Sequence, residues 1–398
     1  MNEYILSLKA DKTKFAFKFL LFVWLCSVPF KNSIYQISTI LLLVFCIWHF
    51  VYYKNYFILK ENFNKTKILS FFVGLIILSM FLSNLLNLEL LTKDSWKNTL
   101  SFIYRYAFVF IALAYFYSLK FFSKKETIFM LLFGTMILAL SGIFEAILNP
   151  NILFGNVSNS DTTGLTGPLN NRNAMGLMMS ASVVFSLFIL RKNLLFGFIL
   201  LAIYGFCMIF SFSRSGWVAS GVAFLIFLAL NFKKFDKRFF IAAILFIVAL
   251  VLIYLNVDSF QTRFNQLLEG YSSYRTELWK YALSQIINQP FFGHGNSVWR
   301  SLDLPPDIAL HTGVHNSTIE ILLFTGIFGL FAWISAVLVV FFNILKSKNF
   351  IYLSLLTYFI VITQFDFSVF DSKELFSYVS VFLFLVYSDK FKESFCKH

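Results

Sequence analysis

Apolar runs, each close to the length that crosses a lipid bilayer, follow one another along most of this 398-residue chain. A spanning helix needs about 20 mostly apolar residues to cover about 30 Å of hydrocarbon. Twelve such runs can be delimited, at approximately residues 15–30, 34–53, 68–86, 100–119, 127–147, 173–190, 194–211, 215–231, 239–256, 316–345, 350–370 and 374–388. Only 13% of the residues are charged, whereas soluble domains carry about 25%. We predict an all-α integral membrane protein with about twelve transmembrane helices.

The placement of positive charge predicts the orientation of the chain. If the N-terminus is cytoplasmic, about two thirds of the 33 Lys and Arg residues fall on that side, in short connections, as the positive-inside rule requires. We therefore predict a multi-pass protein of the cell inner membrane with both termini cytoplasmic. No small-residue cleavage site follows the first run, so we expect that run to be retained. The basic residues form no continuous face, so the net charge of +13 indicates topology and no nucleic-acid partner.

Two long connections, 148–172 and 257–315, lie on the opposite, periplasmic side in this orientation. Within the second, an amphipathic pattern predicts a helix that lies on the membrane surface or caps a cavity. The residues of this pattern are Tyr271, Tyr274, Leu278, Tyr281, Ala282 and Ile286. The chain is thus expected to divide into helices one to nine (1–256), a large periplasmic loop (257–315) and helices ten to twelve (316–398).

Four polar groupings stand out from the apolar background, and all fall on the predicted periplasmic side. They occupy 164–173, 211–217, 274–279 and 315–320. Because long loops on one side of a membrane protein often carry function, this coincidence favours one shared site.

The residue types in these groupings suit a lipid-linked diphosphate sugar. Arg214 and Arg275 offer permanently charged, forked donors for phosphate oxygens. His315 stands where a helix is expected to begin and is a potential proton acceptor near neutral pH. We expect the arginines to stabilise charge developing on a departing diphosphate, in place of a metal ion. The histidine would then deprotonate an attacking sugar hydroxyl.

Structural interpretations of the same residues remain open. Arg214 is also explained as an interfacial anchor, Arg275 as a solvated helix residue, and His315 as a helix cap. Glu320, one turn inside a span, needs a partner, and Asn316 lies on its face at i−4.

Other titratable residues have simpler interpretations. Arg105 and Glu145 sit near the outer ends of their spans, where they could pair. We interpret His294 and His311 as solvent-exposed loop residues and His49 as structural. Asp303 and Asp307 are separated by two prolines and lack a third ligand, so we expect no metal site and no cofactor.

At these residues the chain resembles the O-antigen ligase family, which shares its core region with O-antigen polymerases. The most specific match is His315-Asn316, nine residues, Gly326, two residues and Gly329. The turn Ser213-Arg214-Ser215-Gly216 is similar to the family's Ser-Arg-Gly turn with one serine inserted. The stretch from Arg275 to Gly295 is similar to the family's arginine helix and its Gly-x-Gly exit. The resemblance covers roughly residues 160–335.

The resemblance implies an inverting, metal-independent glycosyltransferase with a GT-C-type fold, embedded among membrane lipids. It would move a glycan from undecaprenyl diphosphate to a sugar of lipid A–core, in lipopolysaccharide biosynthesis. By carry-over, His315 is the candidate base, and Arg214 and Arg275 would hold the diphosphate. The residues expected to contact substrate are Asn316, Arg172, Asn173, Glu320 and Arg105.

Three alternatives remain at this level. An O-antigen polymerase or a protein O-oligosaccharyltransferase would use much the same core with another acceptor. We favour the ligase because of the twelve spans and the one dominant loop before the histidine. A flippase or transporter of lipid-linked glycans should show cations along a central cavity and broken helices or repeated halves. This chain has six prolines and no visible repeat, and its notable residues gather at one surface.

Overall fold

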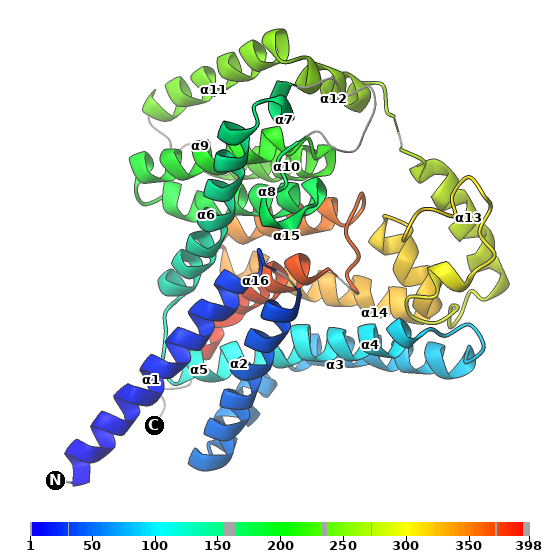
Figure 1. Ribbon diagram of the computed structural model, residues 1–398. Coiled ribbons are helices and arrows are strands. Elements are labelled where there is room, and N and C mark those ends of the chain that lie inside the picture. The colour runs from blue at the N-terminus through cyan, green and yellow to red at the C-terminus, as the bar shows by residue number, and fades with distance from the viewer. Residues whose placement is uncertain are drawn as a thin grey trace. The chain divides into compact units, whose positions relative to one another are not determined.

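The computed structural model describes residues 2–30, 32–154, 164–232, 237–271, 273–370 and 372–392, and these residues are helical with no strand among them (Figure 1). The α-helices are α1 (Asn2–Ser27), α2 (Asn32–Tyr53), α3 (Tyr56–Leu86), α4 (Lys93–Phe102), α5 (Val109–Ser118), α6 (Lys124–Leu148), α7 (Asn151–Phe154), α8 (Arg172–Leu190), α9 (Leu194–Phe210), α10 (Arg214–Asn231), α11 (Lys237–Asn256), α12 (Asp258–Leu268), α13 (Arg275–Asn288), α14 (Ser317–Ser347), α15 (Ile351–Ile362) and α16 (Lys373–Lys392). A π-helical segment, Ile103–Phe108, joins α4 to α5.

Each of the twelve predicted runs overlaps helical structure, but the run 350–370 extends past the end of α15 at Ile362, and the run 100–119 crosses from α4 through the π-helical segment into α5. Among the described residues, eight helices are long and apolar enough to cross a membrane. The apolar helices α9 and α15 are shorter. The prediction of an all-helical integral membrane protein is therefore supported, while the number of twelve spans and the GT-C type stay predictions.

The chain forms two compact units. Unit 1 comprises Met1–Gly134, Glu277–Ser347 and Ser368–His398, and unit 2 comprises Thr135–Thr276 and Lys348–Phe367. In unit 1, α3 runs along α14 and α16 packs on α5. In unit 2, α8 packs against α9, α10 and α15. The division into 1–256, 257–315 and 316–398 predicted from the sequence describes consecutive membrane segments rather than compact units. It stays a prediction.

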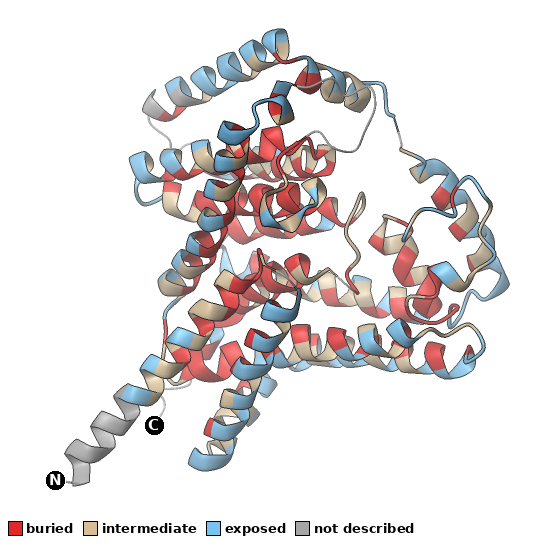
Figure 2. Cartoon of the chain, in the orientation of Figure 1, coloured by how far each residue is buried: buried red, intermediate tan, exposed pale blue. Residues whose placement is uncertain are grey.

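Burial separates packed helices from helices that expose apolar faces. In unit 2, α8 is buried over most of its length, whereas α11 is largely exposed (Figure 2). The exposed side chains of α11 are apolar, with Ile244 at 60% and Leu255 at 66% exposure. Apolar area of this kind costs about 25 cal/mol per Å² in water, so it fits contact with lipid.

The helix α14 is broken at Gly326, where φ is 66° and ψ is −168°. The segment that leaves α13 docks its backbone into this break. The amide of His294 donates to the Leu323 carbonyl (2.9 Å), and the amide of Ile327 donates to the Pro290 carbonyl (2.8 Å). Backbone groups orphaned by the break are thus satisfied by the incoming segment.

Glycine is required on both sides of this contact. A Cβ at Gly326 would lie 2.1 Å from the Phe291 carbonyl oxygen, and one at Gly293 would lie 2.6 Å from the Leu323 carbonyl oxygen. Gly293 and Gly326 also adopt positive φ, which only glycine tolerates at low cost. Gly326 of the His-Asn…Gly-x-x-Gly motif and Gly293 of the Gly-x-Gly motif therefore serve close backbone approach.

Polar side chains at the C-terminal end of α3, Ser83 and the cap residue Asn87, hold the docked segment in place. The Ser83 hydroxyl donates to the Phe324 carbonyl (2.5 Å) and accepts from the Gly295 amide (2.8 Å). The Asn87 amide group donates to the Gly293 carbonyl (3.0 Å). These bonds stabilise the break because they add polar partners to buried backbone groups, and the Gly295 amide also donates to the Phe324 carbonyl (3.2 Å).

The amphipathic helix begins later than predicted. Its buried stripe of Leu278, Ala282 and Ile286 is confirmed on α13. Tyr271 and Tyr274 lie before the helix, because Ser273 and Tyr274 adopt positive φ values of 50° and 64°. These dihedral angles cannot continue into a right-handed helix.

A second helix in the same loop, α12, was not anticipated. Its Phe260 is buried, and it packs on α10 and α11 within unit 2. The signal in the sequence was Asp258 at its start, a favourable acidic residue in a first turn, followed by Phe260, Phe264, Leu267 and Leu268 at helical spacing.

We expect Gly326→Ala to destabilise unit 1 by about 3 kcal/mol or more, because it adds both a steric overlap and a strained φ. The measurement is the thermal midpoint of the full-length protein in detergent, together with its abundance in membranes. Gly74→Ala in α3 is the matched control, since nothing lies within 4 Å of a Cβ there. Equal stability of the two variants would contradict the close backbone contact.

Candidate functional site

The predicted site residues fall into two groups, one in each unit. Unit 2 contains Arg172, Asn173, Arg214 and Arg275, and unit 1 contains Arg105, His315, Asn316 and Glu320.

The three predicted site arginines in unit 2 share one position in local structure. Arg172, Arg214 and Arg275 are the first residues of α8, α10 and α13. Arg214 is repelled electrostatically by Arg275 and Arg172 and attracted by Asp366. A helix N-terminus carries partial positive charge, so cations there oppose the macrodipole. Helix stability therefore disfavours this cluster of arginines. Its positive charge, together with the free amides of the helix starts, is suited to binding an anion.

Arg214 is held by the loop that precedes α13. Its Nη1 donates to the carbonyls of Tyr271 (2.9 Å) and Gln266 (3.3 Å), and its Nη2 donates to the Ser273 hydroxyl (2.7 Å). Its guanidinium carbon lies 5.5 Å from the centre of the Tyr271 ring. These bonds use three of the five N–H groups of a guanidinium. Arg214 is thus fixed in orientation by its own chain.

The segment after α15 positions the other parts of this cluster. The Phe365 carbonyl accepts from Nε of Arg275 (2.7 Å). The neighbouring Asp366 carboxylate accepts from the Ser215 hydroxyl (3.3 Å). The serine inserted in the Ser-Arg-Gly turn is therefore used to contact Asp366. Asp366 was missed from the sequence, where its only signal was a carboxylate inside the apolar run 350–370, near its end.

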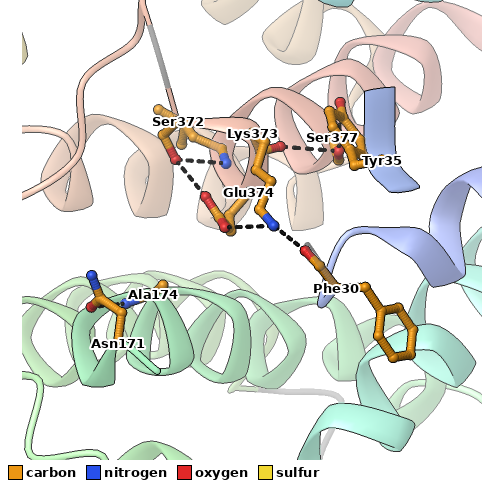
Figure 3. Close-up of polar contacts among 9 residues, drawn as sticks. Phe30, Tyr35, Asn171, Ala174, Ser372, Lys373, Glu374 and Ser377 are labelled. Carbon is orange, nitrogen blue, oxygen red and sulfur yellow. Dashed lines mark hydrogen bonds and ion pairs between the residues drawn. The ribbon is translucent and has the colours of Figure 1, made fainter. Parts of the chain in front are cut away.

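The start of α8 is capped by Asn171. Its side-chain oxygen accepts from the backbone amides of Asn173 (2.9 Å) and Ala174 (3.1 Å), the latter contact drawn in Figure 3. A Cβ on Gly176 would lie 2.2 Å from Cβ of Ser213. This close approach sets the turn before α10 directly against α8, and Arg172 and Arg214 begin the two helices.

Glu145 has structural partners of its own in unit 2. Its carboxylate accepts from the backbone amides of Thr166 (3.1 Å) and Gly167 (2.7 Å) and from the Thr166 hydroxyl (3.0 Å). It therefore anchors the polar segment that leads into α8.

In unit 1, His315 lies two residues before the start of α14 and adopts a positive φ of 55°. Asn316 is the helix cap, because its side-chain oxygen accepts from the Ile319 amide (3.0 Å). The capping role considered for His315 thus belongs to Asn316. Glu320 is buried at 6% exposure and its amide donates to the Asn316 carbonyl (2.9 Å).

Two tryptophans bind the backbone of the loop that carries His315, and a second histidine lies near its ring. The indole N–H of Trp279 donates to the Val314 carbonyl (3.1 Å), and that of Trp299 donates to the His311 carbonyl (3.0 Å). The rings of His311 and His315 lie 6.3 Å apart at 88°. Both ends of the loop before α14 are therefore tied down. Sequence reasoning missed these three residues, although Trp279 lay within one of the singled-out groupings.

The interpretation of the remaining histidines needs one correction. His294 is not solvent-exposed: it is 5% exposed, and its Nε2 lies 2.9 Å from the Gln285 carbonyl. It is buried because the neighbouring backbone docks into the break of α14. His311 is half-buried beside His315 and is not a fully exposed loop residue. His49 is buried with Nδ1 2.9 Å from the Tyr115 hydroxyl, which fits its structural interpretation.

Arg105 lies on the π-helical segment and is 4% exposed. Its Nε donates to the Tyr104 hydroxyl (3.2 Å), and its guanidinium carbon lies 5.1 Å from the Phe376 ring and 5.4 Å from the Tyr35 ring. Segments of π-helix often occur at functional sites. The expectation that Arg105 contacts substrate remains a prediction.

Next to Arg105 in unit 1, the start of α16 holds another cation. Lys373 lies 3.7 Å from the Glu374 carboxylate and donates to the Phe30 carbonyl (Figure 3). Burial lowers the pKa of Lys373, while Glu374 raises it and Arg105 lowers it.

No group of three or more His, Cys, Asp or Glu side chains within the described ranges is arranged to hold a metal ion. Asp303 and Asp307 therefore form no such group there.

The fold and these residues define an all-helical membrane protein with a basic cluster at converging helix starts and a histidine before a capped helix. Residues 197–334 match the family model described as O-antigen ligase, about a third of the chain, which confirms the resemblance seen in the sequence. The match includes Arg214, Arg275, His315 and the glycines of the helix break. It supports an activity of the O-antigen ligase or polymerase type in general, acting on lipid-linked glycans. A search of curated proteins found no match.

We expect Asn316→Ala to lower stability by about 1 kcal/mol, because it removes the cap of α14. Asn316→Asp keeps the acceptor and should retain wild-type stability. Thermal midpoints of both full-length variants in detergent would measure the difference. If the alanine variant were as stable as wild type, capping would not be the role of Asn316.

Proposed function

We propose that this protein is an O-antigen ligase-type glycosyltransferase that moves a glycan from undecaprenyl diphosphate to a sugar of lipid A–core at the periplasmic face of the inner membrane. The observation that carries the proposal is the match over 197–334, which contains Arg214 and Arg275 of the cluster and the candidate base. The donor, the acceptor and the residue roles are part of the proposal.

The arginine cluster is suited to the diphosphate. An acceptor hydroxyl would attack the anomeric carbon from the face opposite the diphosphate. A new glycosidic C–O bond would form, the C–O bond to the diphosphate would break, and undecaprenyl diphosphate would leave with the bonding electrons. Arg214 and Arg275 would stabilise the negative charge that grows on the departing diphosphate. The positive charge of Arg172 would add to this stabilisation. Their placement at helix starts adds oriented amides to the same task.

His315 is the proposed general base. It would take the proton of the attacking hydroxyl, a contribution of about 10²- to 10⁴-fold in rate. The bonds from Trp279 and Trp299 to the preceding loop restrict how that loop can move. Such restraint is what a positioned base requires. The proposal requires His315 to reach the substrate held by the arginines.

The broken helix α14 bears on the transporter alternative. Broken helices are typical of transporters, where half-helix ends face a substrate or ion. Here the Leu323 and Phe324 carbonyls accept from the His294 and Gly295 amides of the docked segment. The break is occupied by the chain's own backbone, so it favours a structural role over an ion site.

The function is tested by reconstituting the purified full-length protein with undecaprenyl diphosphate-linked glycan, in the presence of a chelator. Rough lipid A–core, a short glycan and an acceptor protein are offered in parallel. We expect transfer to lipid A–core alone, undiminished by chelator. Transfer to the glycan would identify a polymerase, and transfer to the protein an oligosaccharyltransferase. Loss of transfer with chelator would contradict the metal-independent mechanism.

We expect His315→Ala to reduce transfer at least about 100-fold without lowering membrane abundance. The readout is glycan transferred per molecule of protein in membranes. A variant as active as wild type would exclude His315 as the base.

Arg275→Lys should also impair transfer, about tenfold or more, because lysine cannot form the forked contact with phosphate. Arg300→Lys is the matched control, since Arg300 is exposed in a short helical turn and has no proposed role. Equal transfer by the two variants would demote Arg275 to a structural role.

A further inference from the structure

We infer that Tyr271 and Tyr274 form a sugar-binding platform that contacts the first sugar of the lipid-linked donor. The inference rests on the proposed function, because it takes the arginine cluster as the diphosphate site.

Both tyrosines are presented to the outside by a constrained loop. Tyr271 is 53% exposed and Tyr274 is 52% exposed. Tyr274 adopts a φ of 64°, a conformation that is strained for a bulky residue and that persists only where the surroundings impose it. Large aromatic side chains are usually packed away, so two half-exposed rings on one short loop stand out.

The loop with the two tyrosines is connected to two arginines of the cluster, one by hydrogen bonds and one by the chain itself. Arg214 donates to the Tyr271 carbonyl and the Ser273 hydroxyl, and its guanidinium faces the Tyr271 ring at 5.5 Å. Arg275 directly follows Tyr274 and is fixed through its Nε to the Phe365 carbonyl. The positions of the two rings are therefore coupled to the cationic cluster.

The chemistry of the donor places a sugar at this point. The anomeric carbon is joined to the diphosphate through one bridging oxygen, so the first sugar lies within three bonds of the non-bridging phosphate oxygens that arginines bind. A sugar ring offers an apolar C–H face, which packs against an aromatic ring, and hydroxyls that hydrogen-bond with a phenol. Tyrosine supplies both, and it loses little conformational entropy when it binds.

A different role for exposed tyrosines in a membrane protein is anchoring at the lipid–water interface. That role predicts a loss of membrane insertion on substitution and no discrimination between ligands. The platform predicts the opposite: substitution should weaken binding only of a ligand that carries the sugar. The two roles are therefore separable by comparing two ligands that share the lipid and the diphosphate.

The test measures binding of two ligands to the full-length protein in nanodiscs. One ligand is undecaprenyl diphosphate-linked glycan, and the other is undecaprenyl diphosphate without sugar. We expect Tyr271→Ala and Tyr274→Ala each to weaken binding of the glycan-linked lipid about tenfold, equivalent to about 1.4 kcal/mol. Binding of the sugar-free lipid should change less than twofold. Tyr56→Ala is the matched control, since Tyr56 is 60% exposed at the start of α3 in unit 1.

Each outcome decides the matter. Equal weakening of both ligands, unchanged binding of both, or a loss of membrane abundance alone would overturn the platform. Tyr274→Phe should retain most of the affinity if ring packing dominates. The proposed function fails separately: if Arg275→Lys leaves binding of the sugar-free lipid unchanged, the arginines do not hold the diphosphate, whatever the tyrosine variants show.

Discussion

The backbone contact at the break of α14 is the constraint on which the rest of unit 1 depends. At Gly326 the helix opens, and the segment from Pro290 to Gly295 supplies the missing hydrogen-bond partners. Unpaired backbone groups are costly in an apolar environment, and most costly in lipid. The break is therefore stable only with the segment in place. The contact fixes where α13 ends, how the loop before His315 starts, and why His294 is buried.

In unit 2, the arginines of the proposed site stand at positions that lower the stability of their own helices. Arg172, Arg214 and Arg275 each begin a helix, where the macrodipole disfavours a cation. Arg214 offsets part of that cost with three hydrogen bonds to the 266–273 segment. Functional sites are expected where residues depart from the preferences of local secondary structure and other contacts compensate for the loss of stability. The proposed diphosphate site and the proposed sugar platform follow from this one arrangement.

The two groups of predicted site residues differ in how they are held. The arginines are fixed through carbonyls and hydroxyls of neighbouring segments, including Phe365 beyond α15. His315 is fixed through its own loop, by the Asn316 cap and the indoles of Trp279 and Trp299. The residues that hold the arginines and His315 therefore occupy defined positions, as the site residues themselves do. A proposed transferase needs this rigidity, because misplacement of a base or cation lowers the rate steeply.

The sequence by itself determined the apolar helices, their order and most chemistry-bearing residues, because apolar run length and residue type are local properties. It also located Gly293 and Gly326, through motif spacing. It did not anticipate α12. It did not reveal that Asp366 contacts Ser215, that His311 packs on His315, or that Tyr271 and Tyr274 lie outside the helix. Only the tertiary structure decided these points. The Ser215–Asp366 contact joins residues far apart in the chain. The place of the two tyrosines follows from backbone dihedral angles, such as the positive φ at Tyr274, that no residue pattern specifies.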